Sequence, residues 1–251
     1  MHFDSLDAIF FDLDDTLLDH RGAVRRGLHD VYGLYPAFFG SLDFAQVHAA
    51  WHAINEAIWE EYSRGLLTAG ELRLQRARQL VDWVRSMLGT AAGTTPEEIR
   101  DSYMRCYEDH CTLYDGVLPM LDALKDRYTL GIITNGFASV QGRKIGGTGL
   151  GGRIGHVIVS EEVGVHKPDA EIFRIALASA HVEAAGSVYV GDNYLWDVRG
   201  AAGAGMATVW YNAIGTHRPA EYADVDPLAE VRSIGDLASL FGITLERSPQ
   251  S

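Results

Sequence analysis

A chain of 251 residues is long enough for one large α/β domain, or for a medium domain carrying a smaller inserted one. Its net charge of −13 disfavours nucleic acid polymers and anionic membrane surfaces as partners. Cys106 and Cys111, five residues apart in one predicted helix, fit neither a disulfide framework nor a zinc site. Without a signal-like start or an apolar run near the ~20 residues of a membrane span, we expect a soluble, cytoplasmic protein.

The first predicted strand, at residues 8–11, is directly followed by a polar cluster. Asp12, Asp14, Asp15 and Thr16 stand within five residues of one another. Carboxylates repel one another by about 1 kcal/mol in water at ~4 Å, and by roughly four times as much near a protein surface. A divalent cation is the expected compensator. Asp15 and Thr16 have a second interpretation, in which their side chains only cap the chain as it leaves the strand.

The long segment after this cluster contains no run that looks like a buried strand. Its patterns Thr68 to Glu71 and Thr95 to Glu98 are capping boxes, the second with Pro96 at the first helical position. We expect a helical insert from about residue 20 to residue 111, able to close over the carboxylates. One apolar helical stripe in it is formed by Phe44, Val47, Trp51, Ile54, Ile58 and Tyr62.

Four more apolar runs predict strands that are buried on both faces. Predicted helices at 170–180 and 195–202 lie between the later ones. Strand–helix alternation predicts an α/β fold with a parallel, doubly wound sheet and right-handed crossovers. The four runs are residues 130–134, 157–160, 188–191 and 207–211.

A glycine-rich segment at residues 146–155 contains the spacing of a dinucleotide-binding loop, from Gly147 to Gly152. No strand directly precedes this spacing and no clear helix opens from it, so the context is wrong for a dinucleotide site. We interpret the segment as a flexible surface turn, and its role stays open.

Three further polar blocks lie where the ends of the later strands are expected. In an open parallel sheet, ligands bind outside the carboxyl ends of the strands. Hydroxyl, amide, loop N–H and ammonium groups can hold phosphate oxygens, while carboxylates hold a cation and supply a nucleophile. Lys167 is one of three lysines, although a solvated surface lysine is the alternative interpretation. The blocks are Thr134-Asn135-Gly136, His166-Lys167-Pro168, and Gly191-Asp192 with Asp197.

Taken in order, the four blocks resemble those of the haloacid dehalogenase superfamily of aspartate-nucleophile hydrolases, and the match spans nearly the whole chain. The resemblance implies that Asp12 is the nucleophile and Asp14 the general acid/base. It implies a Rossmann-like core at 1–18 and 113–245, with an all-helical cap domain at 19–112. Residues implied to bind phosphate are Thr134, Asn135, Gly136 and Lys167.

The same resemblance implies a magnesium cofactor. Its ligands would be the Asp12 and Asp192 carboxylates and the backbone carbonyl of Asp14. Asp197 would be an inner ligand or would orient a metal-bound water.

Residues that differ between reactions of this superfamily favour a phosphatase. Dehalogenases lack the acid/base carboxylate that Asp14 supplies here, and no lysine lies between Asp12 and Cys111 to form the Schiff base of phosphonate-cleaving members. A phosphomutase, a sugar-phosphate phosphatase and an inactive phosphate-binding module stay open as alternatives. We expect a monomer or homodimer that acts on a small phosphorylated metabolite.

The expected substrate is a small nucleoside monophosphate, pyrimidine ones first, with sugar phosphates as the runner-up. Segments 58–62, 131–137 and 160–168 look similar to pyrimidine 5′-nucleotidases, and the chain also resembles sialic-acid phosphatases. Aromatic rings in the insert would stack on a base, or would only pack between helices. The rings are Trp51, Trp59 and Tyr62, and nearby guanidinium groups are those of Arg21, Arg25 and Arg26.

Overall fold

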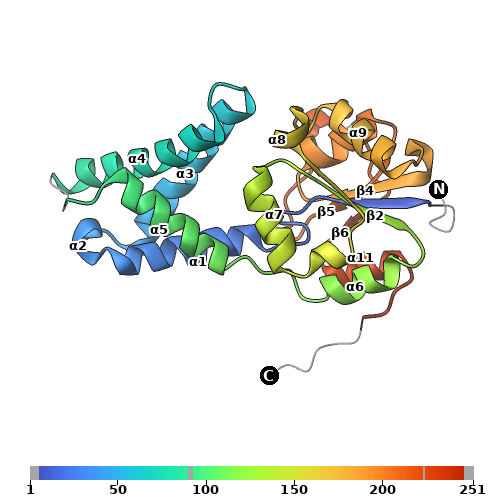
Figure 1. Cartoon of the computed structure of the whole chain (residues 1–251), viewed down its shortest axis with the longest axis horizontal. Coiled ribbons are helices and arrows are strands. Elements are labelled where there is room, and N and C mark those ends of the chain that lie inside the picture. Colours follow the sequence, from blue (N-terminus) through green and yellow to red (C-terminus); the bar gives the residue numbers. More distant parts are fainter. Residues whose placement is uncertain (1–5, 90–92, 223, 246–251) are drawn as a thin grey trace. The chain divides into compact units, whose positions relative to one another are not determined.

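The computed structural model describes residues 6–89, 93–222 and 224–245. The chain divides into two compact units (Figure 1). We call Met1–Asp19 together with Thr112–Ser251 the α/β unit, and His20–Cys111 the helical unit. Every helix in the described part of the chain is too short or too polar to cross a membrane.

A six-stranded parallel sheet forms the centre of the α/β unit, in the order β3-β2-β1-β4-β5-β6. The predicted fold class is therefore confirmed, and five strands lie where apolar runs predict them. The sixth, β6, was missed because it is short and only its last residue is buried. The strands are β1 (Ala8–Phe11), β2 (Thr129–Thr134), β3 (His156–Val159), β4 (Ser187–Gly191), β5 (Ala207–Tyr211) and β6 (Ala229–Val231).

Helices cover both faces of this sheet (Figure 1). On one face lie α6 (Val117–Leu124) and α11 (Ile234–Leu240), while α9 (Ala170–Ala180) lies on the other. The core under α9 contains Phe10 of β1 and Tyr189 of β4, both fully buried. The other helical elements of this unit are α7 (Ala138–Gly147), α8 (Ser160–Val163), α10 (Gly200–Gly203), the π-helical turn η4 (Tyr194–Arg199) and the 3-10 turns η2 (Leu150–Gly152), η3 (Ala184–Gly186) and η5 (Ala220–Tyr222).

The helical unit is built from long helices that pack in pairs: α1 against α5, α3 against α4, and α4 against α5. Both predicted capping boxes form, at Thr68 and at Thr95, and each stabilises its helix by about 1 kcal/mol. Asp43 and Gln46 form a third, which the sequence analysis missed. The helices are α1 (His20–Leu34), α2 (Pro36–Phe39), α3 (Phe44–Ser63), α4 (Ala69–Leu88) and α5 (Pro96–Asp109).

The chain leaves the α/β unit and returns to it through two adjacent segments. Asp19 N donates a hydrogen bond to Thr112 O (2.9 Å), and Tyr114 N donates one to Leu17 O (3.0 Å). The outgoing and returning segments are thus hydrogen-bonded to each other within the α/β unit.

One local prediction was wrong. Cys111 lies beyond the end of α5, so the two cysteines do not share one helix, and both are free thiols. The glycine-rich segment starts within α7, which continues to Gly147, and its remaining glycines lie in exposed turns, although Leu150 among them is fully buried. Gly149 has a φ of +81°, the left-handed conformation in which glycine commonly ends a helix.

Candidate active site

Asp12 lies at the carboxyl end of β1, in the middle of the sheet. Phe11 pairs with both Ile132 of β2 and Val190 of β4, and Asp12 N donates a hydrogen bond to Val190 O (2.8 Å). The Asp12 side chain is buried, with 8% of its surface exposed. The strand order therefore brings residues that follow β2 and β4 to either side of this carboxylate.

A tight turn follows Asp12. Asp15 adopts a φ of +62°, which aspartate tolerates better than most residues, and Leu17 N and Leu18 N both donate to Leu13 O. The fully buried Thr16 donates its hydroxyl hydrogen to Asp12 Oδ2 at 3.4 Å. Thr16 thus contacts the predicted nucleophile, whereas the backbone of the turn bonds to itself.

Lys167 joins three of the four polar blocks. Its ammonium nitrogen lies 2.6 Å from Asp12 Oδ1 and 2.6 Å from Asp197 Oδ1. It also donates to the Tyr189 hydroxyl at 3.0 Å. Only 3% of the Lys167 side chain is exposed, so the alternative of a solvated surface lysine does not hold.

Asn135 fixes the backbone at Lys167. Lys167 N donates to Asn135 Oδ1 (2.8 Å), and Asn135 Nδ2 donates to Lys167 O (3.0 Å). Gly136 N donates to Ser160 Oγ (3.1 Å). Two of the predicted phosphate-binding residues therefore make hydrogen bonds that shape the loops, while Thr134 and Lys167 present their side chains beside the carboxylates.

Burial dominates the electrostatics of this cluster. It raises the pKa of Asp12 to about 7, against the opposing effect of Lys167. Burial also acts to lower the pKa of Lys167, but the charges of Asp12 and Asp197 outweigh it and raise that pKa. Burial, with the nearby aspartates, keeps the pKa of Tyr189 well above its ordinary value, so its hydroxyl stays protonated.

Three carboxylates could hold a metal ion. One oxygen each of Asp12, Asp192 and Asp197 lies within 4.8 Å of the others. Oxygen ligands at this density suit a hard divalent cation such as Mg²⁺, and the one ammonium of Lys167 does not balance three negative charges. The residues present therefore fit the metal that the sequence predicts, although the Asp14 side chain lies outside this group.

The segment that follows β4 positions the Asp197 side chain. Its π-helical turn η4 replaces the start of the helix predicted at residues 195–202. Asn193 Oδ1 accepts a hydrogen bond from Trp196 N, and Asn193 N donates to Asp197 Oδ2, both at 2.9 Å. A Cβ at Gly191 would lie 2.4 Å from Asp197 Cγ, so the site needs glycine there.

A second lysine and a glutamine, both missed by the sequence analysis, contact Asp14. Lys144 Nζ lies 2.8 and 2.9 Å from the two Asp14 oxygens. Gln141 Nε2 donates to Asp14 Oδ2 (2.9 Å) and to Thr134 Oγ1 (2.7 Å). Both residues lie on α7, which follows the Thr134 block. The scarcity of lysine was the available signal, since Lys144 is one of only three in the chain.

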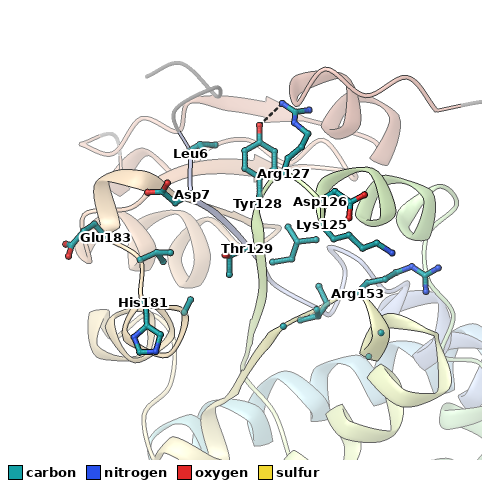
Figure 2. Close-up of a pocket in the computed structure, with 17 residues that line it drawn as sticks. Leu6, Asp7, Lys125, Asp126, Arg127, Tyr128, Thr129, Arg153, His181 and Glu183 are labelled. Atoms are coloured by element: carbon teal, nitrogen blue, oxygen red, sulfur yellow. Dashed lines mark hydrogen bonds between the residues drawn. The ribbon is translucent and has the colours of Figure 1, made fainter.

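A separate hollow of about 1010 Å³ lies at the opposite, amino-terminal edge of the sheet (Figure 2). Its lining includes Leu6 and Thr129, next to or at the starts of β1 and β2, and none of the predicted site residues. Its arginines have protein partners: Arg127 donates to the Tyr128 hydroxyl, and Arg153 pairs with Asp122. The predicted site residues therefore lie away from this hollow, at the edge where the strands have their carboxyl ends.

Comparison with known proteins agrees with this geometry. The family model of haloacid dehalogenase-like hydrolases matches residues 6–205. The chain belongs to this family. The predicted resemblance is thus confirmed, and the protein is a hydrolase. Members of this family generally use a divalent metal, in line with the three carboxylates of Asp12, Asp192 and Asp197.

Individual relatives are similar over nearly the full length. The pyrimidine 5′-nucleotidase YjjG of Escherichia coli is 31% identical, covering 93% of this chain and 97% of the relative. The phosphoserine phosphatase of Thermus thermophilus is 30% identical with the same coverage. The magnesium-bound structure of the HAD-hydrolase YfnB from Bacillus subtilis has a TM-score of 0.77 at 24% identity, covering 95% and 99% of the two chains, and shows the same fold. The phosphatase class predicted from the sequence agrees with the names of both relatives.

Proposed function

We propose that this family member is a magnesium-dependent phosphomonoesterase that forms an aspartyl-phosphate on Asp12. The observation that carries the proposal is the position of Asp12: a buried carboxylate at the sheet edge, 2.6 Å from the Lys167 ammonium and within 4.8 Å of Asp192 and Asp197. A nucleophilic carboxylate needs such neighbours, because they neutralise the phosphoryl oxygens that it approaches.

The reaction would run in two steps with one acid/base. An Asp12 oxygen attacks phosphorus, the bond to the leaving oxygen breaks, and Asp14 donates a proton to that oxygen. Water then attacks the aspartyl-phosphate, Asp14 takes the proton from that water, and inorganic phosphate leaves with Asp12 restored. Lys167 and the Thr134 hydroxyl would hold the phosphoryl oxygens during both steps.

Asp12, Asp192, Asp197 and the backbone carbonyl of Asp14 would hold the magnesium ion. When bound, it neutralises negative charge on the phosphoryl group and on the crowded carboxylates.

Trapping of the intermediate tests this function. Wild type and Asp12→Asn are incubated with magnesium and a ³²P-labelled phosphomonoester, quenched in acid and assayed for protein-bound label. We expect label on the wild type only, in a form that hydroxylamine releases. Equal labelling of Asp12→Asn would reject Asp12 as the nucleophile.

We propose that the substrate is a small nucleoside monophosphate, with pyrimidine bases preferred and sugar phosphates as the second candidate. The similarity to YjjG supports this preference, since that relative is a pyrimidine 5′-nucleotidase. Trp51 packs against Tyr103 with 1% exposure, so we assign it to packing. Trp59 is only half-buried, so it stays the candidate ring for base stacking.

The substrate preference is tested by kcat/KM for UMP and dTMP against hexose phosphates, N-acylneuraminate 9-phosphate and phosphoserine. We expect both nucleotides to be preferred, and Trp59→Ala to reduce that preference about tenfold, since one stacked base contributes ~1–3 kcal/mol. Trp51→Ala is the control for lost packing. A tenfold preference for a sugar phosphate that neither substitution alters would contradict the nucleotide proposal and leave the phosphatase proposal intact.

A further inference from the structure

We propose that Lys144 and Gln141 are positioning residues that hold the ionised Asp14 carboxylate beside the phosphate site, in place for the proton that it carries to the leaving oxygen during the reaction. This inference rests on the proposed function, in which Asp14 is the acid/base. Neither residue belongs to the four polar blocks recognised in the sequence. Their role follows from their contacts with Asp14 and Thr134 and from the space that Gly136 leaves for Gln141.

Lys144 and Gln141 constrain both oxygens of Asp14. The Lys144 ammonium lies 2.8 Å from Oδ1 and 2.9 Å from Oδ2, and Gln141 Nε2 donates to Oδ2 at 2.9 Å. The exposed fractions are 5% for the Lys144 side chain and 22% for Asp14. An aspartate with one partner can rotate its carboxylate, whereas donors to both oxygens fix the plane in which it lies.

Gln141 also ties Asp14 to the phosphate site. The same Nε2 atom donates to Thr134 Oγ1 at 2.7 Å, and the glutamine is 1% exposed. One amide nitrogen thus bridges the predicted acid/base and a predicted phosphate-binding hydroxyl. The distance between the proton donor and the phosphoryl group is therefore set by protein contacts before any substrate binds.

The backbone leaves room for this bridge. Gln141 and Lys144 are three residues apart on α7, so they share one helix face. A Cβ at Gly136 would lie 2.8 Å from Gln141 Nε2 and 3.0 Å from its Cδ. Glycine as the third residue of the Thr134-Asn135-Gly136 block therefore gives the glutamine side chain its space.

Stability alone gives little reason for this ion pair. Removing two charges from water offsets most of their attraction, and apolar replacements of such pairs are often neutral. A buried lysine that faces a predicted acid/base is better explained by orientation of that group. Replacing Lys144 alone leaves the Asp14 carboxylate without this counter-charge, so Lys144→Met is expected to lose stability, and its folding is checked by circular dichroism.

The leaving group provides a readout that separates positioning from structure. A poor leaving group departs as an alkoxide or phenoxide unless it is protonated, so breaking its bond to phosphorus needs Asp14 in place. A dinitrophenolate is stable without a proton and does not. Loss of positioning should therefore harm kcat/KM only as the leaving group becomes more basic, because kcat/KM reports the step that transfers phosphorus to Asp12.

The experiment compares wild type, Lys144→Met, Gln141→Met and Asp14→Asn on 2,4-dinitrophenyl, 4-nitrophenyl and phenyl phosphate with magnesium. For Lys144→Met we expect kcat/KM on phenyl phosphate to fall about 10- to 100-fold, a part of the ~10²–10⁴ that acid/base catalysis supplies, and on dinitrophenyl phosphate to change less than about threefold. Gln141→Met should also lose more kcat/KM on phenyl phosphate than on dinitrophenyl phosphate. Lys144→Arg should keep part of the activity that Lys144→Met loses.

Lys125→Met is the matched control. It also removes a lysine paired with an aspartate, since Lys125 Nζ lies 2.7 Å from Asp122 Oδ1 on the surface. We expect its activity to be unchanged on all three esters. Combining Lys144→Met with Asp14→Asn should cost no more than Asp14→Asn alone, because the lysine acts through that carboxylate.

Equal losses across the three esters, or a raised KM with unchanged kcat, would overturn the positioning role of Lys144. No loss in Lys144→Met, confirmed as folded by circular dichroism, would overturn it as well. If Asp14→Asn itself showed no dependence on the leaving group, the proposed function would fail, and the two failures are thereby distinguished.

Discussion

Two lysines face aspartates at the same edge of the sheet, but their surroundings differ. Lys167 is enclosed by the carboxylates of Asp12 and Asp197 and by the Tyr189 hydroxyl, with Asp192 close by, so negative charge exceeds positive. Lys144 pairs with Asp14, which also accepts a hydrogen bond from the uncharged Gln141. The first cluster is suited to a divalent cation and to phosphate, whereas the second is suited to fixing one carboxylate. Under the proposed function, the first cluster would serve phosphoryl transfer and the second would serve proton transfer.

Metal removal should give the largest effect and should act on the first cluster alone. We expect excess EDTA to abolish turnover of 4-nitrophenyl phosphate, and magnesium to restore it, since Asp12, Asp192 and Asp197 need a cation to balance their charges. Magnesium should also raise the thermal unfolding temperature of wild type and Lys144→Met equally. Turnover that survives chelation would contradict the metal site.

Substituting Gly191 should displace the residues around Lys167 and should therefore lower kcat/KM for every substrate. In Gly191→Ala the new Cβ would lie 2.4 Å from Asp197 Cγ, so Asp197 and the lysine that it contacts must move. A displacement of about 1 Å at a reacting centre costs roughly 10²-fold. We expect that loss in kcat/KM on good and poor leaving groups alike. A loss confined to poor leaving groups would show that the two clusters are not separate.

Gly136→Ala should disturb the second cluster instead. Its Cβ would meet the flexible end of Gln141 at 2.8 Å, which can partly yield, so we expect a smaller loss of about tenfold from misplacement. The loss should grow with the basicity of the leaving group, as for Lys144→Met. In stopped-flow measurements with dinitrophenyl phosphate, Gly136→Ala should show an initial burst of dinitrophenolate. The first step does not need Asp14 with this ester, whereas the second step uses Asp14 and becomes slow.

The smallest effect is expected for Tyr189→Phe, which removes one hydroxyl from the Lys167 cluster. That hydroxyl accepts from Lys167 and lies 3.0 Å from Ile133 O and 3.2 Å from Asp197 Oδ1. We expect unfolding to become easier by about 1–1.5 kcal/mol, typical of one lost hydrogen bond, in urea denaturation. Activity should fall a few fold without dependence on the leaving group. An unchanged midpoint of urea denaturation would mean that the Tyr189 hydroxyl contributes nothing to stability.

Much of the site that the sequence predicts is carried by strand ends, whereas Lys167 and Asp197 were predicted from the resemblance to a known family. Asp12, Thr134 and Asp192 directly follow or end buried strands, and parallel pairing brings such positions together. Lys144 and Gln141 lie inside a helix and Tyr189 inside a strand, where spacing predicts burial but not which polar groups meet. Their contacts depend on the rotation of α7 and on the absence of a side chain at Gly136, which local sequence patterns do not specify.

The helical unit shows the same limit. Capping boxes depend on residues three apart and are readable from sequence, as at Thr68 and Thr95. The burial of Trp51 against Tyr103 depends on α3 and α5 meeting, far apart in the chain. Substrate preference, oligomeric state and location in the cell stay predictions for this reason, since each depends on surfaces rather than on a local pattern.

The paired segments that carry the chain out of the α/β unit and back have an evolutionary consequence. Because Asp19 and Thr112 are hydrogen-bonded neighbours, the sheet would keep its connectivity if the intervening helices were shortened, exchanged or replaced by a short link. Closing a loop between adjacent ends costs free energy that grows only slowly with its length. The inserted helices can therefore diverge in evolution while the residues proposed to bind and transfer the phosphoryl group stay unchanged.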